Sequence, residues 1–202
     1  MTDAPIDPFA QRKAEYAAPR RPKLLDVGDA WFLSLDGIGR PDEPRFQEAR
    51  QALLTTARAL QRQAKAEGRP FRLSKLEALW SLEPGHHDFD AAPSQAWQWT
   101  LCLQAPDFVG DNMLLPLKQQ LLSRGASKLI RRVKLIGFVE GRSAQMLLVG
   151  PREGIHRRLG PLDAFIESRG LTVVGRRHEV HLSDERRADP AKVRTLVRYP
   201  VI

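Results

Sequence analysis

A short stretch near the C-terminus, residues 176–183 with the sequence RRHEVHLS, carries the side chains best suited to chemistry. Side chains alternate between the two faces of a β-strand, so this pattern places Glu179 and His181 on one face together with Arg177. A carboxylate in the middle of a strand is unfavourable unless it is solvated, paired or bound to a ligand. Two interpretations follow: a Glu179–Arg177 ion pair on an open sheet face, or a pocket carboxylate that meets a cation or transfers a proton, with His181 beside it.

Three tryptophans are the next candidates. Trp97 and Trp99 stand two residues apart in an apolar stretch, so they share one strand face. Such rings either pack in a core or form the walls of a groove that holds a flat or cationic ligand. Glu77 precedes Trp80 in the first half as a possible counterpart of Glu179, against the alternative of an ordinary surface glutamate. The candidate ligand-binding residues are Glu77, Trp80, Trp97, Trp99, Phe138, Glu179 and His181, of which Glu179 and His181 are also the candidate catalytic residues.

Other catalytic and binding motifs fail on spacing. His178 and His181 point to opposite faces of a strand, and residues 86–90 (HHDFD) form one loop without a distant partner group, so we expect no metal site. The sequence contains no dinucleotide fingerprint, no phosphate-binding glycine loop and no Gly-x-Ser-x-Gly elbow, which predicts no bound cofactor. Cys102 lies in an apolar strand and is interpreted as a packed small side chain.

The hydrophobic periodicity predicts the elements that must position these residues. The first half carries an extended segment, a helix that Pro44 opens and Gly68 ends, and two further strands. The second half repeats this order, and a helix and a strand that turns at Glu140 and Gly141 separate the halves. The predicted strands are 24–35, 71–82, 95–104, 133–139, 142–149, 171–183 and 195–201, and the predicted helices are 44–68, 111–122 and 154–168. Pro161 predicts a kink in the last helix, or a start one turn after Gly160.

This order predicts an α+β fold of two βαββ repeats related by a pseudo-twofold axis. The half-repeats cover residues 24–105 and 142–202, and a ligand groove is expected between the two half-sheets, since pockets favour interfaces between packed units. Residues 24–202 are then one binding domain. Residues 1–23, rich in Pro and Ala, are expected to form a flexible arm.

Composition narrows the class of protein. The 202 residues have a formal net charge of +8, but the Arg doublets are scattered from Arg20 to Arg187 among acidic residues, so nucleic-acid binding is only a minor alternative. No apolar run is long enough to span a membrane, and the N-terminus lacks a secretory signal. With a single cysteine as well, a cytoplasmic protein is expected.

Several collinear segments resemble the GyrI-like small-molecule-binding family. The matches extend from about residue 24 to residue 201, and together they are more specific than any one of them. They include LDGIG at 35–39, LEALW at 76–80, WQWT at 97–100, PDFV at 106–109 and HEV at 178–180.

This resemblance implies two βαββ units around a central groove that binds lipophilic, often cationic aromatic compounds with an aromatic cage and a buried glutamate. Glu179 takes the place of that glutamate. Without a preceding helix-turn-helix, the chain resembles the stand-alone members, which are associated with xenobiotic protection. One such subfamily hydrolyses the strained cyclopropane of DNA-alkylating compounds.

The sequence departs from this family at several cage positions. Positions at which relatives often carry aromatic residues hold other side chains here, which predicts weaker binding of lipophilic cations and favours anionic or zwitterionic aromatic ligands. These positions are Leu54, Arg58, Ser81, Arg152 and His181. Whether binding is followed by hydrolysis, and hence whether the protein is an enzyme, is left open, as is its oligomeric state.

Overall fold

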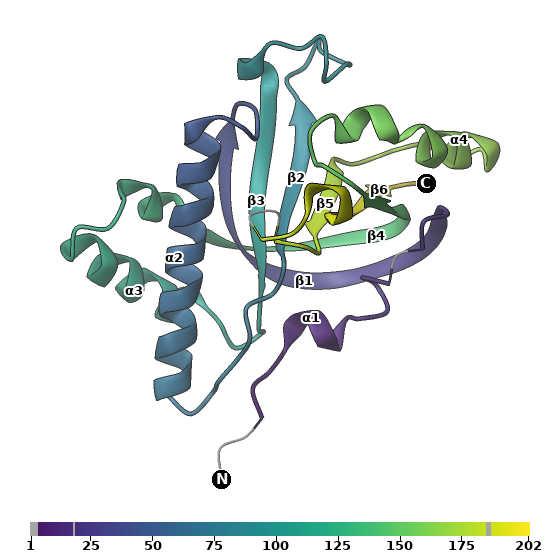
Figure 1. The fold of residues 1–202 in the computed structure, drawn as a ribbon. Helices are drawn as coiled ribbons and strands as arrows, with labels where there is room; N and C mark the ends of the chain where they lie inside the picture. The colour runs from purple at the N-terminus through teal and green to yellow at the C-terminus, as the bar shows by residue number, and fades with distance from the viewer. Residues whose placement is uncertain (1–3, 18, 185–186) are drawn as a thin grey trace.

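The computed structural model describes residues 4–17, 19–184 and 187–202. Its six β-strands form one closed antiparallel barrel in the order β1-β3-β2-β5-β6-β4 (Figure 1). The strands are β1 (Lys23–Ile38), β2 (Leu76–Leu82), β3 (Trp97–Ala105), β4 (Lys134–Val149), β5 (Arg177–His181) and β6 (Arg194–Pro200).

Helices cover the outside of this barrel. The longest, α2, runs across β1 and β3 with α3 beside it, whereas α4 lies over the other half and α1 lies below (Figure 1). In the part of the chain that the structure describes, no helix combines the length and apolar character that a bilayer crossing requires. The helices are α1 (Pro8–Gln11), α2 (Pro44–Ala66), α3 (Asp111–Ser123) and α4 (Gly160–Ser168), and the short 3-10 helices are η1 (Ser94–Ala96), η2 (Lys128–Arg132), η3 (Ile155–Arg158) and η4 (Pro190–Lys192).

The α+β class predicted from the sequence is confirmed. Along the chain the elements follow the order β1, α2, β2, β3, then α3, then β4, α4, β5, β6. The expected half-sheets are not two separate layers, because their edges pair. β2 pairs with β5, and β1 pairs with β4, which closes the sheet into a barrel. Each of the six strands therefore has a neighbouring strand on both sides.

Several predicted element boundaries are wrong, and the strands expected over 71–82 and 171–183 cover only Leu76–Leu82 and Arg177–His181. The turn expected at Glu140 and Gly141 does not form, since β4 continues through both residues and pairs with β1 on either side of them, between Lys134 and Gln145. Gly141 has φ = 71°, a backbone conformation that glycine adopts without steric cost, so it allows the strand to pass. The interruption predicted at Pro161 is present: the helix expected over 154–168 is divided into η3 and α4, because Pro161 has no N–H to donate and fits only the first turn of a helix.

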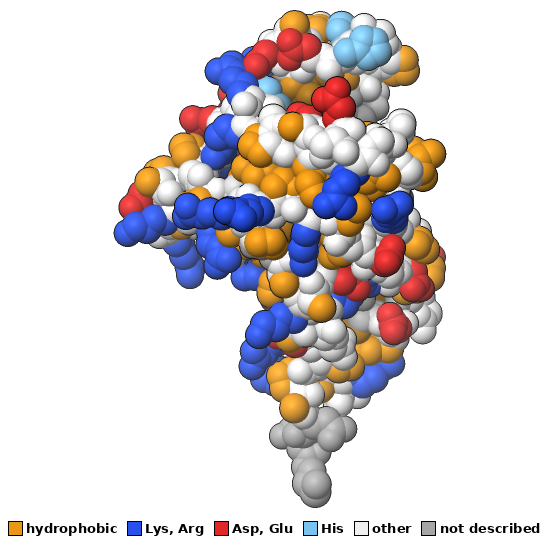
Figure 2. Space-filling view, turned by 90° about the vertical axis from the view of Figure 1, so that its right-hand side faces the viewer, with side chains coloured by type: hydrophobic (Ala, Val, Ile, Leu, Met, Phe, Trp, Pro, Cys, Tyr) orange, Lys and Arg blue, Asp and Glu red, His pale blue; other side chains and the backbone are white. Residues whose placement is uncertain are grey.

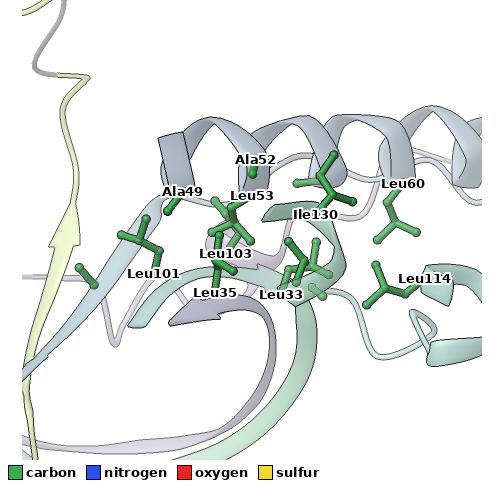
Figure 3. Close-up of a cluster of buried hydrophobic side chains, with 14 of the residues drawn as sticks. Leu33, Leu35, Ala49, Ala52, Leu53, Leu60, Leu101, Leu103, Leu114 and Ile130 are labelled. Atoms are coloured by element: carbon green, nitrogen blue, oxygen red, sulfur yellow. The ribbon is translucent and has the colours of Figure 1, made fainter. Parts of the chain in front are cut away.

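An apolar core fixes α2 on the barrel (Figure 3). Pro44 occupies the first turn of α2, where its missing N–H costs nothing, and small and leucine side chains follow at helical spacing. Leu53 and Leu60 are fully buried in one cluster with Leu35 of β1 and Leu101 of β3, and Leu60 lies beside Leu114 of α3 (Figure 3). A second apolar cluster lies beneath α4.

The N-terminal segment, residues 4–17, is not the loose arm that composition predicts. Ile6 bridges to Phe71, α1 follows, and Tyr16 is buried with its ring stacked on Phe9 at 4.6 Å between centroids. Arg12 donates hydrogen bonds to the carbonyl oxygens of Gly28 and Asp29 on β1. Apolar and backbone contacts that no local pattern reveals therefore hold this segment on the barrel.

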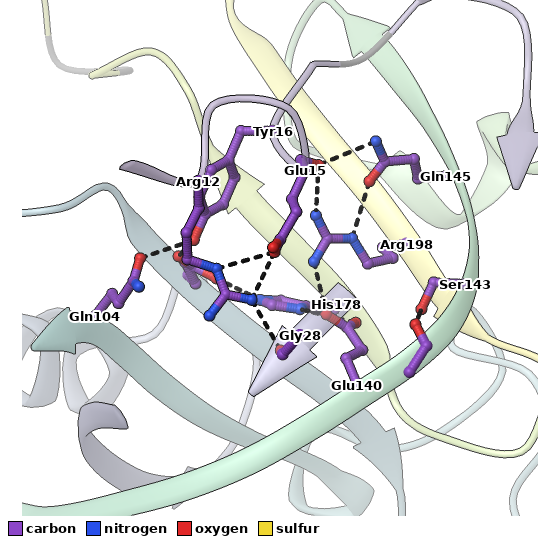
Figure 4. A network of polar contacts seen from close by, with 12 residues as sticks. Arg12, Glu15, Tyr16, Gly28, Gln104, Glu140, Ser143, Gln145, His178 and Arg198 are labelled. Atoms are coloured by element: carbon purple, nitrogen blue, oxygen red, sulfur yellow. Dashed lines mark hydrogen bonds and ion pairs between the residues drawn. The ribbon is translucent and has the colours of Figure 1, made fainter. Parts of the chain in front are cut away.

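Beneath this segment lies a buried chain of polar side chains, here called the polar cluster (Figure 4). The Tyr16 hydroxyl donates to Glu77 Oε1 at 2.8 Å, and Glu77 Oε2 lies 2.8 Å from His178 Nε2. His178 Nδ1 lies 3.0 Å from Glu140, which in turn accepts from Arg198 Nη1 at 2.7 Å. The cluster joins the N-terminal segment to β2, β4, β5 and β6.

Charges inside the polar cluster determine its protonation. The carboxylates of Glu140 and Glu77 outweigh the effect of burial and raise the pKa of His178 to about 9. His178 and Arg198 in turn lower the pKa of Glu140 to about 2. Burial and the Glu77 carboxylate raise the pKa of the Tyr16 phenol, so it remains a donor. The imidazolium therefore lies between two carboxylates at neutral pH.

The raised pKa of His178 predicts that the protein becomes less stable as the pH rises above neutrality. An unfolded histidine has a pKa of about 6.5, whereas the folded value is about 9. The stabilisation is therefore complete below pH 6.5 and is lost as the pH rises through 9. Between these values, the free energy of unfolding in urea is expected to fall by about 1.4 kcal/mol per pH unit.

The matched variants are His178→Gln and His87→Gln, the second on an exposed loop residue. The first variant is expected to flatten the pH dependence between 6.5 and 9, and the second to retain it. An unchanged slope in His178→Gln would contradict the assignment of this proton to the polar cluster.

Candidate functional site

Strand β5 divides its side chains between two environments. Arg177, Glu179 and His181 face the side of the sheet that α2 covers, whereas His178 faces the polar cluster on the opposite side. The register places Ala78 of β2 and Val197 of β6 directly beside Glu179. Glu179 is therefore a charged residue in a row of small and apolar side chains.

A cavity of about 160 Å³, here called the central pocket, opens above these residues. Its walls come from the start of α2, from β2, β3 and β5, and from the segment before α4. The lining residues are Pro41, Asp42, Phe46, Gln47, Arg50, Trp80, Trp97, Arg152, Glu153, Gly154, Ile155, His156, Arg177, Glu179 and His181. Four of the candidates from the sequence, Trp80, Trp97, Glu179 and His181, thus lie in one pocket.

Aromatic rings form one side of the central pocket. Phe46 stacks on Trp80 with 5.6 Å between ring centroids, and the edge of Trp97 meets Trp80 at 5.9 Å. Phe89 packs edge-on against Trp97 at 4.8 Å. Rings held in this way present large, rigid apolar surfaces, which suit a planar ligand.

The ion pair proposed from strand spacing exists, but its environment is not the expected one. Arg177 Nε donates to Glu179 Oε1 at 2.9 Å. Both residues are almost fully buried, with 3% and 4% of their surfaces exposed, so the prediction of an open sheet face is wrong. A buried pair is held more firmly than a surface pair, because loss of either partner leaves an uncompensated charge.

His181 lies at the same end of the central pocket as Glu179. Burial, followed by the nearby charges of Arg152 and Arg50, lowers its pKa well below the usual histidine value. The imidazole is therefore neutral at physiological pH. Within the described residues, its Nε2 atom is buried without a hydrogen-bond partner.

Trp99 does not line the central pocket. Its indole lies over Gly37 of β1, where a Cβ would be 2.1 Å from the ring, and its edge meets Phe46 at 5.2 Å. Trp99 thus packs against Phe46, which lines the pocket. Trp97 and Trp99 lie on the same face of the sheet, as predicted. On that face, Trp97 lines the pocket, whereas Trp99 packs in the core.

Glu77 and Phe138 lie on the opposite face of the sheet, away from the central pocket. Glu77 is 1% exposed and belongs to the polar cluster, so it is not a surface glutamate. Phe138 stacks on Phe32 at 4.7 Å and lies near His178. Both contribute to a second, water-sized cavity of about 10 Å³, and neither shares a pocket with Glu179.

The sequence analysis did not identify several residues that form or support the pocket. Phe46 is one of the apolar residues of α2, and periodicity alone does not distinguish it from core. Asp90 accepts hydrogen bonds from Arg157 at 2.7 and 2.6 Å and lies 2.8 Å from His156, so the loop after β2 is joined to the segment before α4. This contact places Phe89 beside Trp97, and only long-range geometry reveals it.

The described part of the chain holds no group of three or more His, Cys, Asp or Glu side chains able to bind a metal ion. His178 and His181 point to opposite faces, as strand alternation predicts. Cys102 is fully buried, and burial raises the pKa of its thiol, which suits a packing role.

Basic side chains are abundant on the molecular surface, but they are mixed with others. On the face shown in Figure 2, Lys and Arg gather around the middle, beside apolar side chains. Acidic side chains lie to their right and above them on the same face (Figure 2). The net positive charge is therefore not concentrated in one uninterrupted patch on this face.

Comparisons with known proteins identify relatives among solved structures. No family model and no curated protein matches the chain. An uncharacterized conserved protein from Listeria innocua is 33% identical with a TM-score of 0.88, and the match covers 98% of this chain and 100% of that chain. A hydrolase from Listeria innocua is 32% identical with a TM-score of 0.85 over the same shares of the two chains, 98% and 100%.

A third solved structure shows the fold alone. The C-terminal domain of EcmrR is 13% identical with a TM-score of 0.58, and the match covers 90% of this chain and 97% of that domain. The two Listeria proteins instead align from end to end at more than 30% identity. The chain belongs to the family of these Listeria innocua proteins.

Proposed function

We propose that this protein binds a planar, lipophilic small molecule in the central pocket, with Glu179 as its polar anchor. The observation that carries this proposal is the burial of Glu179 in the same cavity as Trp80 and Trp97. An apolar pocket with a few convergent polar groups is the usual form of a small-molecule site.

The size of the cavity supports a ligand with a flat ring. An engineered cavity of about 150 Å³ admits benzene. A volume of about 160 Å³ therefore suits insertion of one ring between the aromatic walls. The rest of a larger ligand would extend toward the exposed rim at Pro41 and Glu153.

The topology supports a GyrI-like architecture with residues 24–202 as one binding domain. Exchanging each strand with its counterpart (β1 with β4, β2 with β5, β3 with β6) reverses the barrel order but leaves it otherwise unchanged, as a pseudo-twofold axis requires. The central pocket takes wall residues from both half-repeats, 24–105 and 142–202. A domain of this kind would sequester flat toxic compounds and so protect the cell from xenobiotics.

A direct test is calorimetric titration with 2-naphthol. The wild-type protein is expected to bind this compound in the central pocket. An aromatic contact is worth about 0.5–1.5 kcal/mol, so Trp97→Leu is expected to weaken binding by about two- to tenfold. Trp31→Leu is the matched control, because Trp31 is half exposed on β1 and does not line the pocket.

Equal affinities of the wild-type protein and Trp97→Leu would contradict the assignment of the pocket. Absence of binding by folded wild-type protein, with 2-naphthol and with its charged analogues, would contradict the proposed function itself.

Hydrolysis is the second candidate, and the similarity to the Listeria innocua hydrolase favours it. Glu179 would accept a proton from water as the water oxygen bonds to a cyclopropane carbon. In the same displacement the ring C–C bond to that carbon breaks, and its electron pair passes into a conjugated carbonyl, whose oxygen is protonated. Neutral His181, on the same strand face, is placed to relay that proton.

This candidate predicts that Glu179→Gln loses turnover of a cyclopropane-containing alkylating compound even at saturating concentrations of that compound. Removal of a general base lowers kcat by about 10²–10⁴-fold. Product formation by liquid chromatography measures the effect. Glu167→Gln, an exposed position on α4, is the matched control with unchanged turnover. Full turnover by Glu179→Gln would exclude Glu179 as the base.

A further inference from the structure

The charge of Glu179 is already balanced inside the central pocket. Arg177 Nε lies 2.9 Å from Glu179 Oε1, and the side chains are 3% and 5% exposed. At this distance and burial, the guanidinium cancels most of the field that the carboxylate would present to a guest. A cationic ligand would have to displace Arg177 to reach an uncompensated carboxylate.

Arg177 is held where it is by further contacts. Its guanidinium carbon lies 4.2 Å from the ring centroid of Phe89, and its charge acts on the pKa of the Tyr199 phenol. Among the described residues, its Nη1 atom has no hydrogen-bond partner although it is buried. An unsatisfied buried donor is costly, so a ligand that supplies an acceptor gains more here than one that supplies a donor.

The remaining charges of the central pocket add positive potential. Arg50 and Arg152 line it together with Arg177, and their charges contribute to the lowered pKa of neutral His181, although Arg50 also lies 3.8 Å from the carboxylate of Asp184. The other two lining carboxylates, Asp42 and Glu153, are exposed, so water and salt screen them. The buried end of the pocket therefore disfavours a ligand that carries a positive charge.

We infer that the ligand of the central pocket is a planar aromatic compound bearing an acidic group, and that Arg177 determines this specificity. This inference rests on the proposed function and names its ligand class. The aromatic ring lies along Trp80 and Trp97, and the acid reaches the Arg177 side of the pocket. Charge-assisted hydrogen bonds from a guanidinium to a carboxylate are among the strongest polar contacts in proteins.

The test compares three probes with the same ring system by calorimetry at pH 7.5: 2-naphthoate, 2-naphthol and 2-naphthylmethylammonium. The wild-type protein is expected to bind 2-naphthoate at least tenfold more tightly than the ammonium compound, with 2-naphthol between them. Arg177→Met exposes the Glu179 carboxylate to the ligand, so the preference is expected to reverse. The double variant Arg177→Met/Glu179→Gln is expected to lose any charge preference.

A second variant keeps the test decisive if Arg177→Met does not fold. Arg152→Gln, at a partly exposed position, is expected to reduce the ratio of 2-naphthoate to ammonium affinity by threefold or more. Arg124→Gln, an exposed residue outside the pocket, is the matched control and is expected to keep the ratio.

The outcomes separate this inference from the proposed function. Tightest binding of the ammonium probe by the wild-type protein overturns the ligand class but leaves the pocket as a binding site. If Arg152→Gln and the wild-type protein have the same ratio of 2-naphthoate affinity to ammonium affinity, the electrostatic explanation is overturned. Failure of all three probes to bind overturns the proposed function and this inference together.

Discussion

The buried ion pair between Arg177 and Glu179 is the interaction on which the chemistry of this protein depends. Glu179 lies between Ala78 and Val197 on a face that is otherwise packed with apolar side chains. A lone carboxylate there would be too costly to bury, and the guanidinium 2.9 Å away compensates its charge. The pair therefore allows a polar group at the bottom of an aromatic pocket and also determines the net charge that a ligand meets.

Strand β5 serves two sites because strand alternation divides its residues. Glu179 faces the central pocket, and His178, its neighbour, completes the polar cluster on the other face. A shift of one residue in the register would exchange these environments, placing an imidazolium among aromatic rings. Pairing with β2 and β6 on both sides, together with the docked N-terminal segment, opposes such a shift.

Local patterns in the sequence predict part of this arrangement. Strand alternation correctly groups Arg177 with Glu179, since that rule depends only on backbone geometry. The same rule groups Trp97 with Trp99 but cannot separate them, because the difference lies in Gly37 of a distant strand, over which Trp99 lies. For a similar reason, the sequence does not reveal that Phe46 forms part of the pocket wall. Burial at these positions depends on which elements meet in three dimensions, and no spacing along the chain encodes it.

A crystal structure of the protein with 2-naphthoate bound would test the account most directly. The account predicts electron density for the naphthalene ring against Trp80 and Trp97, with the carboxylate within hydrogen-bonding distance of Arg177. Density for the ligand elsewhere, such as beside Trp99 or beneath the N-terminal segment, would contradict it. So would a carboxylate that points to solvent while Arg177 and Glu179 remain unchanged.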